Sequence, residues 1–274
     1  MTLAPQRMSR AVYDAIDAVH YSTLKEMRRS PLHYQHRDQT PMTPTSAMVM
    51  GSAVHTAVLE PDRFPLEYVV FDGPRRAGKV WDAFEEANQT KTILKVDEYE
   101  RCLRIRDAVH AHPAARLVLS RGDAEQSFTW TDKDTGLLCK GRADWIGNGV
   151  LADLKVTHSL DPHLFAVTAY RMGTHIQQSF YRTGLANHGL TVYCRVIAVE
   201  PTEPYDVGVF SVGVDVLDVA DEEVRHLLAR VAQCRASGEW PGRFPDEVPL
   251  ELPGWVYRDD GELDELGLTF GGAE

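Results

Sequence analysis

An Asn-Gly step between two runs of alternating side chains is the feature that most constrains this chain. It lies in "GRADWIGNGVLADLKVT", residues 141–157. Both central residues of a type I′ turn need positive φ, which Asn and Gly tolerate, so the step predicts a two-residue hairpin turn at Asn148 and Gly149. The turn also fixes the strand register, and it places Asp144 directly opposite Asp153.

One face of this hairpin is predicted to be charged. Because side chains alternate along a strand, Arg142, Asp144, Asp153 and Lys155 share that face, with Arg142 opposite Lys155. The other face carries Ala143, Trp145, Ala152, Leu154 and Val156. Two adjacent carboxylates repel unless a positive charge lies between them. Either the two basic residues neutralise them on a solvent face, or a divalent cation does, since Mg²⁺ and Mn²⁺ prefer hard oxygen ligands. Taken alone, the hairpin favours the salt-bridged face.

Composition and charge restrict the class of protein. The 274 residues are 43% hydrophobic and 25% charged, as in ordinary soluble globular proteins. No segment has the roughly 18 apolar residues that a membrane span needs, and the N-terminus lacks the apolar core of a secretory signal, so we expect a cytoplasmic protein with no membrane partner. The four cysteines are too scattered for a zinc or iron–sulfur site. A net charge of −11 means that any DNA-binding surface must be local.

The order of predicted elements indicates the fold class. Helices come first, then three antiparallel strands, two helices, two strands and a long helix, which predicts an α/β fold with a mixed central sheet flanked by helices. We expect one domain over residues 1–257, with a helical part to about 122, a core over 123–214 and a C-terminal helical part from 215. An acidic tail, 258–274, is expected to be mobile.

Local signals place several helix ends. Ser22 is a plausible cap for one short helix, and Ser30 followed by Pro31 is a typical start for the next. The small-residue helix in "PTSAMVMGSAVHTAVLEP" is expected to pack closely against the sheet through Gly51, Ala53 and Ala57.

A basic loop, "GPRRAGK", has the spacing of a phosphate-binding P-loop between a strand and a helix. Val80 stands where a hydroxyl should bind magnesium, and Pro74 removes a backbone donor, so the pattern argues against an ATPase. The alternative is a loop whose basic side chains contact a DNA backbone: Arg75, Arg76 and Lys79.

The charged hairpin resembles a known family once distant segments are added. Asp144 followed by "DLK" at 153–155 resembles the signature of the PD-(D/E)XK nucleases. "GSAVH", ending at His55, and "QQSFY", with Gln177 and Tyr181 on one helix face, resemble motifs of the RecB-like branch. Without this context, His55 would more often be a hydrogen-bonded core residue. From about residue 20 to 255 the order and spacing are similar to nuclease domains of the RecE type (exonuclease VIII), although Asp153 stands where many relatives have Glu and clustered cysteines are absent.

The resemblance implies a restriction-endonuclease-like core with a metal site. It implies that His55, Asp144, Asp153 and the carbonyl of Leu154 bind Mg²⁺, with Mn²⁺ as a substitute. Lys155 would orient and help deprotonate a water, and Gln177 and Tyr181 would support that lysine or the scissile phosphate. Residues expected to contact DNA are Ser22, Arg75, Arg76, Lys79 and Arg142.

The expected activity is that of a 5′-to-3′ exodeoxyribonuclease acting on linear double-stranded DNA ends and leaving 3′ single strands for recombination or annealing. The resemblance also implies a homo-oligomeric ring that threads DNA, and a single-strand annealing protein as a partner. Two alternatives stay open: a structure-specific or defence endonuclease on the same core, and a non-catalytic DNA-binding or scaffolding subunit. The intact acids and lysine of the hairpin argue against the second.

Overall fold

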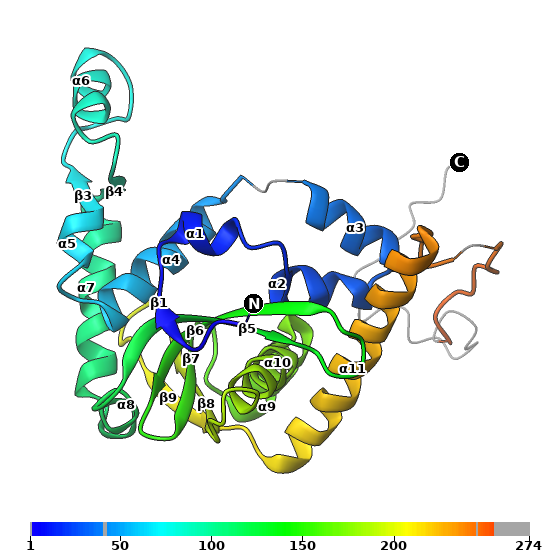
Figure 1. The fold of residues 1–274 in the computed structure, drawn as a ribbon. Coiled ribbons are helices and arrows are strands. Elements are labelled where there is room, and N and C mark those ends of the chain that lie inside the picture. Colours follow the sequence, from blue (N-terminus) through cyan, green and yellow to red (C-terminus); the bar gives the residue numbers. More distant parts are fainter. Residues whose placement is uncertain (1, 41–42, 245, 255–274) are drawn as a thin grey trace, which may run out of the picture.

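A mixed β-sheet forms the centre of the computed structural model, which describes residues 2–40, 43–244 and 246–254 (Figure 1). Within this described part, the sheet has seven strands; six follow the order β1-β5-β6-β7-β8-β9, and β2 pairs with β6. The strands are β1 (Gln6–Arg7), β2 (Val19–His20), β5 (Asp123–Thr131), β6 (Leu138–Gly147), β7 (Val150–Val156), β8 (Tyr193–Val199) and β9 (Val207–Ser211). The predicted mixed α/β fold is confirmed.

The predicted hairpin is present. Asn148 and Gly149 both have positive φ, 53° and 71°, and Gly147 pairs with Val150 as a two-residue turn requires. β5, β6 and β7 are consecutive antiparallel strands. β7 then pairs with β8 in parallel, and β8 with β9 antiparallel. A parallel pair needs a long crossover, which two helices supply: α9 (Pro162–Met172) and α10 (Thr174–Ala186).

Helices bury the sheet on both faces and form two hydrophobic cores. In one core, α10 and the long helix α11 (Val214–Ser237) pack against buried aromatic side chains of β5, Phe128 and Trp130. The other joins β7 and β8 to the helices that lie on the opposite side: α4 (Ser46–Leu59), α5 (Phe64–Glu67), α7 (Val96–Ala111) and α8 (Pro113–Val118). None of the described helices is both long and apolar enough to cross a membrane.

The N-terminal elements lie beside the first core. They are α1 (Arg10–Asp14), α2 (Tyr21–Leu24), the 3₁₀ helix η1 (Lys25–Arg28) and α3 (Pro31–Gln39). Ser30 caps α3 and Pro31 opens it, as predicted. Ser22 is not a cap: α2 begins at Tyr21 with His20 as its N-cap, two residues earlier than predicted, and the Ser22 hydroxyl contacts His20 Nδ1 at 2.8 Å.

An arm projects from the body of the protein at α5 and α7 (Figure 1). It contains a two-stranded parallel sheet, β3 (Tyr68–Phe71) and β4 (Thr92–Lys95), with α6 (Lys79–Ala87) at its tip. Phe71 packs its ring against the rings of Trp81 and Phe84. None of the residues of α6 is buried. The contacts of this small aromatic cluster therefore hold α6 to the strands.

Helix α4 packs against both α7 and the sheet. Its main neighbour is α7, it contacts β6, and its buried residues share a hydrophobic core with Leu154 of β7 and Ile197 of β8. Ala53 and Ala57 are buried as expected, but a Cβ added at Gly51 would meet no atom within 4 Å, so Gly51 is not needed for close packing. The predicted acidic tail lies outside the described residues.

Candidate active site

The hairpin strands separate just before the two aspartates. Backbone pairing of β6 with β7 ends at Trp145 and Ala152, so Asp144 and Asp153 are not the directly paired residues that the turn predicted. The Asp144 carboxylate instead accepts a hydrogen bond from the Leu154 backbone N–H at 2.9 Å. β7 continues alongside β8 and β6 alongside β5. The Asp144 side chain therefore occupies the opening between β6 and β7.

Arg142 does not stand opposite Lys155, contrary to the prediction. It pairs with Ser127 on β5, and its guanidinium donates to the Ser127 hydroxyl at 3.1 Å and to the Met8 carbonyl. Its ion-pair partner is Glu125, at 3.3 Å. The charged face is consequently not a simple ladder of two basic and two acidic side chains.

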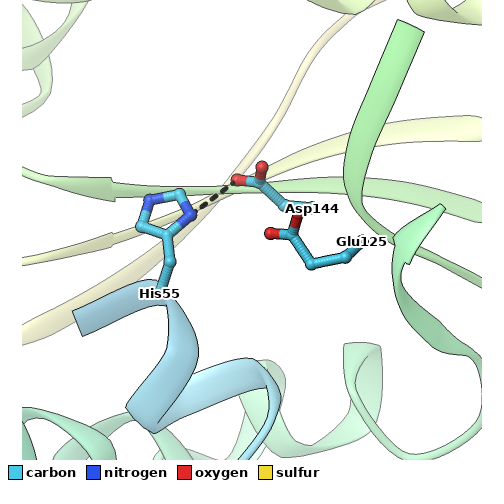
Figure 2. A group of neighbouring side chains, drawn as sticks. All are labelled: His55, Glu125 and Asp144. Carbon is cyan, nitrogen blue, oxygen red and sulfur yellow. Dashed lines mark ion pairs between the residues drawn. The ribbon is translucent and has the colours of Figure 1, made fainter. Parts of the chain in front are cut away.

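Three potential metal ligands converge beside this opening. One ligand atom each from His55 on α4, Glu125 on β5 and Asp144 on β6 lie within 4.8 Å of one another (Figure 2). His55 Nδ1 is 3.4 Å from Asp144 Oδ2. The β5–β6 register places Glu125 across from Asp144, and Glu125 has φ 55°, which is rare for a side-chain-bearing residue.

Glu125 is not among the site residues predicted from the sequence. Its pKa is raised from 4.5 to about 7; burial is the largest cause, the Asp144 charge adds to it, and Arg142 opposes both. The position of Glu125 opposite Asp144 could nevertheless have been predicted from the sequence. The turn at "KDTG" leads to the pairing of Thr131 with Leu138, and counting back along both strands reaches Glu125 and Asp144.

A second polar group lies next to the first. Lys155 Nζ donates to Asp153 Oδ1 at 2.9 Å and to Gln177 Oε1 at 3.1 Å, and the Gln177 amide donates to Asp153 Oδ1 at 2.8 Å. Gln177 comes from α10, so a helix distant in sequence fixes the lysine. Burial lowers the pKa of Lys155, but Asp153 and Asp144 outweigh burial and keep that pKa above its ordinary value. Lys155 is therefore an ammonium at neutral pH.

Asp153 is almost fully buried, at 4% exposure. Burial raises its pKa, Lys155 opposes this, and Asp144 adds to it. Its oxygen Oδ2 lies 2.8 Å from the Lys155 ammonium and accepts no hydrogen bond from the residues that the structure describes. Such an oxygen can accept a further electrostatic partner.

The donor set fits a divalent cation. Two carboxylates of the three-residue cluster supply hard oxygen ligands, and an imidazole completes the group, a mixture compatible with Mg²⁺ and Mn²⁺. Both carboxylates lie side by side, and a cation between them would remove their repulsion. His55 belongs to this group, whereas Asp153 belongs to the lysine group.

Tyr181, Ser22 and the basic loop, which were also predicted to act at the site or on DNA, are not part of the cluster of His55, Glu125 and Asp144. Tyr181 packs its ring against Phe128 and Tyr21 and is partly buried. Desolvation of its hydroxyl raises its pKa well above the ordinary value. Ser22 is on α2, next to Tyr21. The basic loop, residues 73–79, lies on the arm, between β3 and the start of α6 (Figure 1).

Comparison with known proteins identifies the family and supports the fold. A family model described as a PDDEXK-like domain of unknown function (DUF3799) matches residues 20–246. A crystal structure from Eubacterium rectale, titled "Putative exonuclease", superposes with a TM-score of 0.62 over 93% of this chain and 99% of that chain. At 13% identity this likeness shows the fold alone. No curated protein matches by sequence.

Proposed function

Because the chain belongs to the family of PDDEXK-like domains, we propose that it is a divalent-metal-dependent deoxyribonuclease that hydrolyses phosphodiester bonds. The observation that carries the proposal is the meeting of His55, Glu125 and Asp144, from three separate elements, beside the Lys155 group. A structural salt bridge would need neither the histidine nor the second carboxylate. Mg²⁺ is the proposed cofactor, with Mn²⁺ as a substitute.

Each residue then has a chemical task. His55, Glu125 and Asp144 would hold the cation, and the resemblance adds Asp153 and the Leu154 carbonyl. A bound cation polarises the phosphate and lowers the pKa of a coordinated water. Gln177 fixes Lys155, whose ammonium can donate to a phosphate oxygen or orient the attacking water.

The finer proposal is a 5′-to-3′ exonuclease on linear double-stranded DNA. Similarity to RecE-type domains supports it, and the description of the E. rectale protein as an exonuclease supports exonuclease activity without a polarity. A ring-shaped homo-oligomer would reconcile the net charge of −11 with a DNA path, since basic residues could face the channel. A single-strand annealing protein that receives the 3′ strand is the proposed partner, in a cytoplasmic recombination reaction.

Digestion of end-labelled linear duplex and closed circular duplex tests the proposal. With Mg²⁺ or Mn²⁺, we expect the linear DNA to shorten from its 5′ ends while the circle stays intact, and EDTA should stop the reaction. Cleavage of the circle would favour an endonuclease. The variants Lys155→Ala and Asp153→Asn should remain folded and lose cleavage, because both residues serve the reaction centre.

Binding without any cleavage in either metal would favour the non-catalytic DNA-binding subunit. Cleavage retained by Lys155→Ala would contradict the proposed site. Lys133→Ala is a matched control, since Lys133 is exposed in the β5–β6 turn.

A further inference from the structure

A lysine near the proposed site forms no ion pair with the described residues. Lys25 begins η1 and is half-buried. In the part of the chain that the structure describes, its ammonium makes no hydrogen bond and no ion pair. Its neighbour Glu26 pairs instead with Arg29, at 3.2 Å. A half-buried ammonium with neither an ion-pair nor a hydrogen-bond partner is costly, so the position of Lys25 needs an explanation.

Contacts between rings connect Lys25 to the reaction centre. Lys25 Nζ lies 5.9 Å from the ring centroid of Tyr21, and the Tyr21 ring meets the Tyr181 ring edge-on at 6.5 Å. The Tyr21 hydroxyl donates to the carbonyls of Met172 and Gly173, at the junction of α9 and α10. The helix before Lys25 is thereby fixed to the helix that carries Gln177.

Charges of both signs act on Lys25. Burial lowers its pKa, Glu26 opposes this, and Lys155 and Arg37 lower it further. The ammonium groups of Lys25 and Lys155 therefore repel. Lys155 has Asp153 within ion-pair distance, whereas no carboxylate of the described residues forms an ion pair with Lys25, so an anion placed between the two lysines would be stabilised by both.

We propose that Lys25 binds a phosphate of the DNA backbone next to the reaction centre and positions the strand for hydrolysis. This rests on the proposed nuclease function. A lysine suits the task as a compact, flexible point charge that a phosphate oxygen can approach from several directions. The Tyr21 ring beneath it limits where the side chain can go.

The test compares Lys25→Ala, Lys25→Gln and Lys25→Arg with wild type and with Lys133→Ala, which removes an exposed charge elsewhere. DNA binding is measured in EDTA across a salt series, and KM and kcat are measured with Mn²⁺. For alanine and glutamine we expect about tenfold weaker binding, a salt slope lower by about one, and a raised KM. Arginine should restore most of the affinity, and Lys133→Ala should match wild type. Glutamine keeps most of the stem over Tyr21, so it serves if the alanine variant does not fold.

Unchanged affinity and salt slope in folded Lys25→Gln, while wild type cleaves DNA, would overturn this inference and leave the nuclease standing. Lys25-dependent binding by a wild type that cleaves nothing would support the phosphate contact and overturn the nuclease. A wild type that neither binds nor cleaves would overturn both.

Discussion

Replacing Glu125 by glutamine should stabilise the metal-free protein at high pH. Its side chain is 28% exposed, and burial, followed by the Asp144 charge, raises its pKa from 4.5 to about 7. At about 1.4 kcal/mol per pH unit, the difference corresponds to roughly 3 kcal/mol. This is an upper limit, because glutamine pairs less well than glutamate with Arg142.

The sign follows from proton linkage. A carboxyl whose pKa is higher in the folded than in the unfolded state costs stability as pH rises from about 4.5 to 7, and the loss is complete above pH 7. Glutamine does not titrate. The stability of Glu125→Gln relative to wild type should therefore grow between pH 5 and pH 8.

Thermal melting in EDTA at pH 5, 6, 7 and 8 measures this. At roughly 2 °C per kcal/mol for a chain of this size, the gap in Tm should widen by about 5 °C. Glu222→Gln, an exposed position on α11, should show no widening. With Mn²⁺ present, wild type should gain more stability than Glu125→Gln, because wild type keeps the Glu125 carboxylate as a metal ligand. A Tm gap that stays constant from pH 5 to pH 8 in EDTA would refute the argument.

Three further predictions concern other parts of the chain. Mn²⁺ at 100 times its Kd should stabilise wild type by about 2.7 kcal/mol, and His55→Ala should shrink that thermal shift; an undiminished shift would make His55 structural. In the arm, Arg75→Ala with Lys79→Ala should weaken DNA binding and flatten its salt dependence without lowering kcat, whereas measurable ATP affinity lost in this variant would support a P-loop. Gly184→Ala should cost about 1–3 kcal/mol by urea unfolding, because a Cβ there would lie 2.6 Å from two aromatic side chains beneath it. Gly51→Ala, in open space, should instead be neutral or stabilising by up to about 1 kcal/mol, and equal losses in both variants would contradict the packing argument.

Arg76 is left out of the double replacement because it already contacts other residues of the arm. Arg76 donates to the Ile93 carbonyl at 2.9 Å and lies over the Trp81 ring at 5.5 Å. It therefore stabilises the arm itself, and its removal would confuse folding with binding. Arg75 and Lys79 are exposed, so their double replacement tests DNA contact more directly.

Local patterns predicted the parts of the fold that local physics controls. The Asn-Gly turn needs only two residues with positive φ, and the helix beginning at Pro31 needs only its serine cap. The short strands β1, β2 and β4 were missed, because two to four residues carry no periodicity and their partners lie far along the chain. The prediction of Ser22 as a cap was wrong because the N-cap is the residue whose backbone is still extended, which is His20, so Ser22 already lies inside α2.

The candidate site shows the same division. Hairpin counting placed Asp144 and Asp153 next to one another, and they are near enough for their charges to interact. Counting could not show that the ladder ends one pair earlier, since that depends on β5 and β8 drawing the two strands apart. This separation has a chemical consequence. It leaves Asp144 facing His55 and Glu125, and Asp153 facing Lys155 and Gln177, so of the two proposed cation ligands only Asp153 also positions the lysine. Substituting Asp144 should therefore impair cation binding alone, whereas substituting Asp153 should also release Lys155, and the family motif, which treats the two acids as one ligand pair, does not distinguish them.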